Sequence, residues 1–408
     1  MTKKSAFKPL HSSNQINTKR DSGLESLLNS EHTVEIEKMA IGGDGVARIQ
    51  YNQKSLVVFI SKSAPKDILK IKISATEKNY LLGVILEVIT PGPSRRVPLC
   101  TYALHCGGCS WQQFNEVEQL LQKESLLKEL FKKSLPEIKY ILQPTVASPK
   151  PFNYRNRIQL KHLGQQLGYF RHNTHEIVDI DHCPIADERI SSEIKKIKET
   201  LKPSLEVQKY ELKINQDNNL ETMRIGEKGQ GLSFSQVNLY VNELLVASVI
   251  KIAKQFEVLH MTELYAGSGN FSFEFIHHFP QLKLEAVELN PILTQAAAKK
   301  TLVAKLQKRL TFFTADCDSF VNRRSLSQDL ILLDPPRAGC SDSVLEKVRE
   351  SGCKNILYVS CHPVSLLRDL QKLSVKEGLY SISWLQIFDM FPQTDHFETL
   401  VWLTKNQI

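Results

Sequence analysis

A cysteine that joins an apolar run to a proline-led segment is the best candidate nucleophile in this sequence. Cys361 directly follows residues 356–360, which we expect to form a buried strand. Pro363 then opens an amphipathic segment, 364–373, where the fixed φ of proline suits the first turn of a helix. The thiol would lie at a strand's carboxyl end, where α/β proteins bind ligands, and at a helix N-terminus, which favours the reactive thiolate. A buried packing role is the alternative.

A carboxylate with a matching position stands before the last predicted strand. Glu398 ends the segment 388–398, in which polar groups alternate with apolar anchors. Such a mixture is unusual for a solvent-exposed loop without a function. Cys361 and Glu398 therefore form a plausible pair of nucleophile and general base.

Glycines and acids follow four other predicted strands. Gly267 and Gly269 form a Gly-x-Gly turn after the first strand, but the third glycine of a dinucleotide fingerprint is missing, so pyrophosphate binding is not indicated. Glu288 ends the second strand, Asp316 follows the third, and Asp334 closes the fourth in Asp-Pro-Pro-Arg. An acid there can bind ribose hydroxyls, and the set fits S-adenosylmethionine. A tight turn or helix caps are the alternatives.

Four cysteines form a second constellation. Three are clustered as Cys100-x5-Cys106-x2-Cys109, and Cys183 is remote. Four thiolates can hold structural zinc or a [4Fe–4S] cluster. Zinc ribbons more often pair two Cys-x2-Cys knuckles, so this spacing favours the cluster over zinc, and either over unligated cysteines. The remaining cysteines are interpreted as packing residues: Cys317, Cys340 and Cys353.

Composition limits the class of protein. The chain has 408 residues, of which 42% are apolar and 24% charged, enough for two or three domains. No run approaches the ~18 apolar residues of a membrane helix, and the N-terminus lacks the apolar core of a secretory signal. We therefore expect a cytosolic chain without disulfides and without a membrane partner.

The net charge of +8 is concentrated in one stretch. Residues 122–171 hold ten Lys or Arg and three Glu, with aromatic residues interleaved. A basic stripe with stacking groups suits phosphates and unpaired bases, and a solvated surface with extended lysines is the alternative.

The chain divides into four parts by pattern. Residues 1–31 lack a period and predict a flexible basic tail. Residues 32–91 alternate in short β-like pieces, which predicts a small OB-like β-barrel. Residues 92–234 predict a central α+β region with the cysteines and a helix near 113–133, a candidate to pack on the catalytic domain. From 235 to 408, helices alternate with apolar strands, as in a doubly wound, Rossmann-like parallel sheet.

We therefore expect a multidomain α/β protein. The strands expected in its last part are 261–265, 284–288, 311–314, 330–334, 356–360, 381–387 and 399–403, with helices around 237–256, 291–306 and 343–350.

Five motifs in chain order resemble those of the RNA uracil-5 methyltransferases. They are 234–238 (FSQVN), 265–271 (YAGSGNF), 334–339 (DPPRAG), 359–363 (VSCHP) and 390–398 (MFPQTDHFE). Residues 44–48 (DGVAR) resemble the TRAM domain of the ribosomal RNA branch, so the likeness covers about 32–408. Three residues depart from the common pattern: His362 stands where Asn is usual, Glu263 where Asp is, and Ala266 where Cys is.

The resemblance implies a class I S-adenosylmethionine-dependent fold and a role for each site residue. Cys361 would be the nucleophile and Glu398 the general base. The cofactor pocket would be lined by Gln236, Tyr265, Asn270, Glu288, Asp316 and Asp334. A [4Fe–4S] cluster would be held by Cys100, Cys106, Cys109 and Cys183.

The implied activity is methyl transfer to C5 of a flipped-out uridine, in 23S ribosomal RNA, by a monomeric cytoplasmic enzyme through a covalent adduct at C6 of uracil. Three alternatives stay open. The RNA could be transfer RNA or several ribosomal sites; the chain could be a non-catalytic iron–sulfur RNA-binding protein; or Asp334-Pro-Pro could serve exocyclic-amine methylation.

Overall fold

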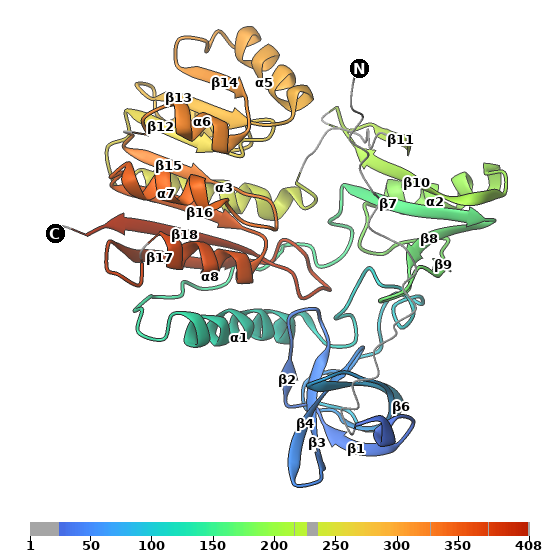
Figure 1. Ribbon diagram of the computed structural model, residues 1–408. Coiled ribbons are helices and arrows are strands. Elements are labelled where there is room, and N and C mark those ends of the chain that lie inside the picture. The colour runs from blue at the N-terminus through green and yellow to red at the C-terminus, as the bar shows by residue number, and fades with distance from the viewer. Residues whose placement is uncertain (1–23, 216, 227–235, 327, 374, 407–408) are drawn as a thin grey trace, which may run out of the picture.

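The computed structural model describes residues 24–215, 217–226, 236–326, 328–373 and 375–406, which form three sheets (Figure 1). Phe234 and Ser235 of the first motif, and residues 1–23 of the predicted tail, lie outside the described residues.

The first sheet is the predicted barrel. Its strands are β1 (Glu31–Glu35), β2 (Lys38–Met39), β3 (Gly45–Tyr51), β4 (Lys54–Ile60), β5 (Ile68–Thr76) and β6 (Tyr80–Thr90), in the order β1-β5-β6-β4-β3-β2. Alternate residues of these strands point into one apolar core. The predicted tail reached too far, because Leu24, the N-cap of the short helix η1 (Glu25–Leu27), and Leu27, its last residue, are buried in that core.

The second sheet is antiparallel and belongs to the central region. Its strands are β7 (Arg157–Gly164), β8 (Gln166–Phe170), β9 (Ile177–Asp179), β10 (Ser204–Ile214) and β11 (Leu220–Ile225), in the order β11-β10-β7-β8-β9. Helix α2 (Glu188–Thr200) supplies Ile190 and Ile194 to a core shared with Leu160 and Leu212 of the sheet.

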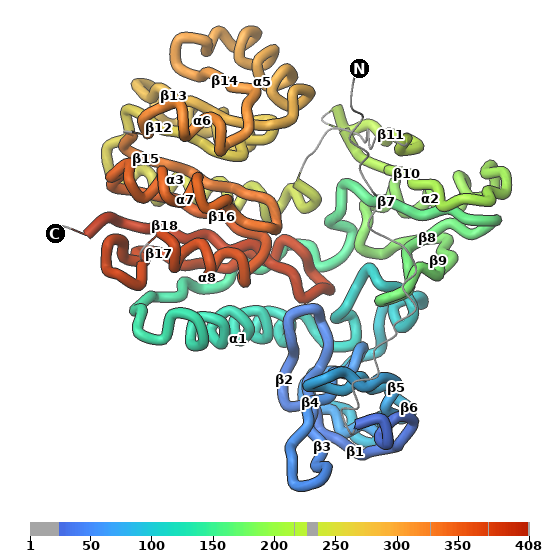
Figure 2. The backbone as a smooth tube through the Cα atoms, in the orientation of Figure 1, coloured from blue at the N-terminus to red at the C-terminus, as the bar shows by residue number. Residues whose placement is uncertain are grey.

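Helix α1 (Glu116–Ser134) belongs by packing to the C-terminal domain. Asn115 caps it by accepting a hydrogen bond from the Glu118 N–H. Leu127 and Phe131 are buried in the core of the C-terminal domain, and the helix also touches β2 of the barrel. Figures 1 and 2 show this helix between the C-terminal domain and the barrel; the chain then continues into the central sheet.

The third sheet has seven strands with helices on both faces. The strands are β12 (His260–Leu264), β13 (Lys283–Glu288), β14 (Leu310–Thr314), β15 (Leu330–Leu333), β16 (Asn355–Ser360), β17 (Tyr380–Phe388) and β18 (Glu398–Lys405). The helices are α3 (Leu239–Ala253), α4 (Ser272–His278), α5 (Pro291–Val303), α6 (Cys317–Arg323), α7 (Asp342–Glu350) and α8 (Pro363–Lys372). Two apolar cores, one for each face, hold the layers together.

One strand of this sheet departs from the predicted parallel arrangement. The order is β14-β13-β12-β15-β16-β18-β17, and β18 runs antiparallel to both of its neighbours. The physical reason is the connection: only residues 389–397 join β17 to β18, and a parallel crossover needs a dozen or more residues. The start of β18 therefore lies at the same edge as the ends of the parallel strands.

Candidate active site

The strand reversal brings Cys361 and Glu398 to opposite positions. The pairing of β16 with β18 ends at Ser360 and Thr399, so the next residues in register are Cys361 and Glu398. Directly opposed residues of an antiparallel pair have Cβ atoms about 4.5–5.5 Å apart. The charge of Glu398 accordingly contributes to a raised pKa of the Cys361 thiol.

The helix after Cys361 begins as the sequence predicts. Pro363 occupies the first turn of α8, and His362 is the N-cap, with its Nδ1 accepting from the Ser365 N–H at 3.4 Å. Burial and the nearby Arg337 lower the pKa of His362, which keeps the ring neutral and able to accept. The residue that departs from the common Asn thus performs a capping role that Asn also performs.

Burial opposes the effect expected of the helix N-terminus on the Cys361 thiol. Burial, followed by the charge of Glu398, raises the pKa of Cys361 to about 12, while Arg337 acts in the opposite direction. Removal of the thiol from water outweighs the favourable end of the helix. Cys361 is therefore protonated at neutral pH.

Glu398 is a buried carboxyl group with spare hydrogen-bonding capacity. The residue is 5% exposed, and its Oε2 has no hydrogen-bond partner. Burial and the charge of Asp334 hold its pKa well above the usual value, and Arg337 opposes them. A buried oxygen without a hydrogen-bond partner lowers the stability of the fold. Such atoms are typical of functional sites, where the group gains a proton or a hydrogen bond during the reaction.

Asp334 and Arg337 lie on the loop after β15, beside this pair. Burial raises the pKa of Asp334 to about 7. Helix α8 holds the loop: Ser365 Oγ donates to the Arg337 carbonyl at 2.9 Å, and Arg368 Nη2 donates to the Ala338 carbonyl at 2.8 Å. One helix thus fixes both the cysteine and the neighbouring arginine.

Three predicted cofactor residues converge at the ends of β12, β13 and β14. Glu288 accepts from the Gly267 N–H at 3.0 Å. Burial raises the pKa of Cys317, and the charges of Asp316 and Glu288 add to the shift. The backbone of Tyr265 lies against the same thiol, at a positive φ of 65°. A Cβ added at Gly267 would meet nothing within 4 Å, so the turn faces open space.

Some of the predicted cofactor residues also form hydrogen bonds within the protein. Asn270 exchanges two 2.9 Å hydrogen bonds with Asn242 and lines a pocket of about 660 Å³ between α3 and α4. Asp316 also caps α6 through the Ser319 N–H at 3.2 Å, so the capping alternative holds for it. The Gln236 carbonyl accepts from Asn156.

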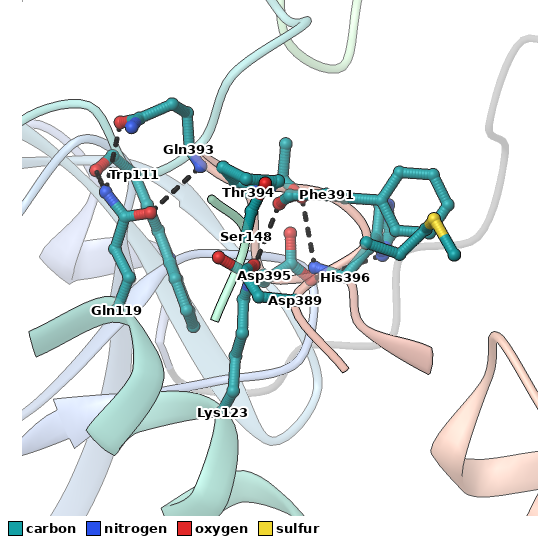
Figure 3. A network of polar contacts seen from close by, with 12 residues as sticks. Trp111, Gln119, Lys123, Ser148, Asp389, Phe391, Gln393, Thr394, Asp395 and His396 are labelled. Carbon is teal, nitrogen blue, oxygen red and sulfur yellow. Dashed lines mark hydrogen bonds and ion pairs between the residues drawn. The ribbon is translucent and has the colours of Figure 1, made fainter. Parts of the chain in front are cut away.

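Sequence reasoning missed the residues that hold the loop 389–397. Lys123 of α1 forms a buried ion pair with Asp389 at 2.5 Å, and Gln119 of α1 accepts from the Gln393 N–H at 2.9 Å (Figure 3). More than 250 positions separate these partners in the chain. The one available signal was the presence of a lysine and a glutamine among the buried positions of an amphipathic helix.

The four predicted cysteine ligands line one cavity of about 30 Å³ together with Arg155 and Tyr169. All four are free thiols. Burial raises the pKa of Cys106 to about 11 and of Cys109 to about 12, and the charge of Cys183 adds to both shifts. In the described part of the chain, no group of three or more His, Cys, Asp or Glu side chains has a geometry that could hold a metal ion.

A lysine of the barrel closes the cysteine loop from outside. Lys62 Nζ donates to the carbonyls of Cys106 and Cys109 at 3.1 and 2.6 Å.

Among the described helices, none is long and apolar enough to span a membrane.

Comparisons with known proteins agree with this architecture. The family model described as tRNA (Uracil-5-)-methyltransferase matches residues 207–406, and the TRAM domain model matches residues 25–86. An uncharacterized RNA methyltransferase of Bdellovibrio bacteriovorus is 37% identical, over 92% of this chain and 95% of its own. The 23S rRNA (uracil(1939)-C(5))-methyltransferase RlmD of Dichelobacter nodosus is 26% identical, over 89% of this chain and 96% of its own.

A solved structure shares the fold. The tRNA (uracil-54, C5)-methyltransferase of Pyrococcus abyssi, in complex with S-adenosyl-L-homocysteine, superposes with a TM-score of 0.69 at 21% identity, covering 91% of this chain and 100% of that one. The 37% identical relative, matched over 92% of this chain, and the two family models show that the chain belongs to the RNA uracil-5 methyltransferase family.

Proposed function

We propose that this chain transfers a methyl group from S-adenosylmethionine to C5 of a uridine in RNA through a covalent adduct with Cys361. The opposition of Cys361 and Glu398 across the β16–β18 pair carries the proposal. A thiol and an unpartnered buried carboxyl group face each other there, with Arg337 acting on both. Membership of the family supports the reaction type.

The first task of the site is to make a thiolate. C5 of uracil is a poor nucleophile, so the Cys361 sulfur adds to C6 and creates enolate character at C5. The thiol proton must leave to solvent, because the Glu398 carboxylate must be unprotonated when it takes the C5 proton. Arg337 lowers the pKa of both groups and so assists each ionisation. RNA that excludes water would strengthen this effect.

S-adenosylmethionine, when bound, supplies the methyl group that C5 accepts. The open face of the Gly267 turn and the converging Tyr265, Glu288 and Asp316 fit its adenosine and ribose, and Asp334 stands between this region and Cys361. Gln236 and Asn270 would complete the pocket on the α3 side.

The second task is to remove the C5 proton. The Glu398 carboxylate takes this proton, the C5–C6 double bond forms again, and the Cys361 thiolate leaves from C6. A base is most effective when its pKa lies near the working pH, and burial moves Glu398 in that direction.

For the cysteines, we propose a [4Fe–4S] cluster held by Cys100, Cys106, Cys109 and Cys183. Three buried thiols and the half-buried Cys100 line one cavity, and burial followed by the charge of Cys183 raises the pKa of Cys106 and Cys109; a cationic centre there would stabilise the thiolates. The cluster would brace the loop structurally. Iron and sulfide analysis with a visible absorption spectrum tests this assignment; a colourless protein with bound zinc contradicts it.

As substrate we propose 23S ribosomal RNA. The support is the named relative of Dichelobacter nodosus, together with the barrel and the cysteine set. Mapping of 5-methyluridine in RNA from a strain that lacks the gene decides the matter, since loss from transfer RNA alone would exclude the ribosomal assignment.

The chemical proposal is tested with RNA that contains 5-fluorouridine, which has no C5 proton to lose. We expect a covalent protein–RNA complex that survives denaturing electrophoresis and is absent in Cys361→Ala. Cys353→Ala is the matched control, because Cys353 is buried in the core away from the strand-end site. Retention of full activity by Cys361→Ser, with N-methylated nucleosides as products, would instead support amine methylation.

A further inference from the structure

The loop 389–397, which leads into Glu398, is held by three other parts of the chain. We propose that Asp395 is a positioning residue: its carboxylate ties the barrel's Gly42–Gly43 turn and Ser110 of the cysteine loop to this loop, and thereby sets Glu398 against Cys361. The inference rests on the proposed function.

Both oxygens of Asp395 are occupied by groups from outside the C-terminal domain. Oδ2 accepts from the Gly42 N–H at 2.9 Å, and Oδ1 accepts from Ser110 Oγ at 3.0 Å. The Asp395 N–H donates back to Ser110 Oγ at 3.2 Å. The side chain is only 7% exposed, so these bonds are shielded from water. Charge-assisted bonds of this kind are the stronger ones.

The barrel turn fits this contact with no spare room. Gly43 has a φ of +88°, and a Cβ there would lie 2.5 Å from Ser110 Cβ and 3.2 Å from Asp395 Oδ1. The Gly43 carbonyl accepts from Trp111 Nε1 at 3.0 Å, and the Trp111 N–H donates to the Gln393 carbonyl at 3.0 Å. The barrel, the cysteine loop and the loop 389–397 are thus stacked in direct contact.

The contact is transmitted to Glu398 over a short, tightly bonded path. Thr394 Oγ1 donates to the Phe391 carbonyl at 2.8 Å and accepts from the His396 N–H at 3.2 Å (Figure 3). Phe397 is buried in the core, and Glu398 then begins β18. A displacement of Asp395 therefore moves the carboxylate rather than being absorbed by slack chain.

The chemistry separates this role from a merely structural one. Attack by Cys361 and methyl transfer do not need Glu398, whereas release of the product does. A variant with a misplaced Glu398 therefore accumulates the methylated covalent adduct on ordinary uridine RNA. A variant that only binds RNA poorly, or that is less folded, loses adduct and turnover together.

The decisive variant is Gly43→Ala in the full-length protein. Gly378→Ala is its control, because Gly378 has a similar φ of +77° but open space around its Cβ. Both proteins are mixed with uridine RNA and methyl-labelled S-adenosylmethionine, and turnover and the fraction of RNA in denaturation-resistant complex are measured. We expect Gly43→Ala to lower kcat at least tenfold and to raise the adduct fraction severalfold, while Gly378→Ala matches the wild type.

Ser110→Ala provides a milder second variant that adds no volume, and it tests the inference if Gly43→Ala fails to fold. We expect it to change kcat and the adduct fraction in the same directions by smaller factors. An unchanged adduct fraction in the folded variants, with or without a rise in KM, would overturn the inference. If the wild type itself forms no adduct with 5-fluorouridine RNA, the proposed function fails; if it does and these variants behave like it, only the role of Asp395 fails.

Discussion

Replacement of Glu398 by glutamine separates the two halves of the proposed reaction. The amide has the shape of the carboxyl group but cannot accept the C5 proton. Because Oε2 has no hydrogen-bond partner, the exchange does not break a hydrogen bond at that atom. The fold and the position of Cys361 should therefore be preserved.

The size of the effect follows from the surroundings of the pair. Loss of a general base costs a factor of about 10²–10⁴, or about 3–5 kcal/mol of transition-state stabilisation. Asp334 is the other acid whose charge acts on both residues. It follows β15, which is separated from β18 by β16, so it does not occupy the position of Glu398. The attack step should not slow, because the charge of Glu398 raises the pKa of Cys361 and the amide removes that charge.

The assay mixes enzyme, uridine RNA and methyl-labelled S-adenosylmethionine, quenches the reaction in detergent and separates free from covalently bound RNA. Glu398→Gln should convert most of its active sites to labelled adduct while turnover falls by about 10²–10⁴. Turnover within tenfold of the wild type, or an equal loss of adduct and turnover, would refute the assignment of Glu398 as the base.

Three further predictions concern ionisable side chains. Lys123→Met leaves Asp389 buried without its ion-pair partner and should lower the free energy of unfolding by about 3–5 kcal/mol in urea titrations; the exposed Lys38, replaced likewise, should cost less than about 1 kcal/mol. Burial raises the pKa of Glu263 to about 8, so its ionisation destabilises the fold as pH rises from about 5 to 8. In Glu263→Gln the free energy of unfolding should therefore fall less over that range, by on the order of 2–4 kcal/mol, and an unchanged pH dependence would contradict this. Arg337→Met removes a charge that lowers the pKa of Cys361, so adduct formation should be slower and its pH profile should move upward; a profile that does not move would contradict the role of Arg337.

The strands of the C-terminal domain could be predicted from sequence to within about two residues, because each is a short apolar run bounded by turns. Helices α4 and α6 were not predicted, since seven residues are too few to show a helical period. Strands β10 and β11 were not recognised, because their exposed positions carry charged and apolar residues alike. The direction of β18 depended on the length of one loop rather than on any residue type.

The site itself was partly predictable. The residues Cys361, Glu398 and Asp334 could be named because motifs with fixed spacing mark strand ends, but their roles stay predictions. The partners Lys123, Gln119, Ser110 and Gly43 could not be named, because each meets the loop 389–397 across a long stretch of chain. The high pKa of Cys361 depends on burial, which local pattern does not report.

The packing of α1 has a consequence for how the protein is made. Leu127 and Phe131 leave the ribosome more than two hundred residues before α8, against which their helix packs. At about 5–20 residues per second, the delay is roughly 10–50 s. During that time the face of the helix that carries Leu127 and Phe131 has no partner surface, although the barrel that contacts its other side is already complete. A chain truncated before α8 therefore keeps an uncovered apolar helix face, which marks such a product for chaperones and proteases.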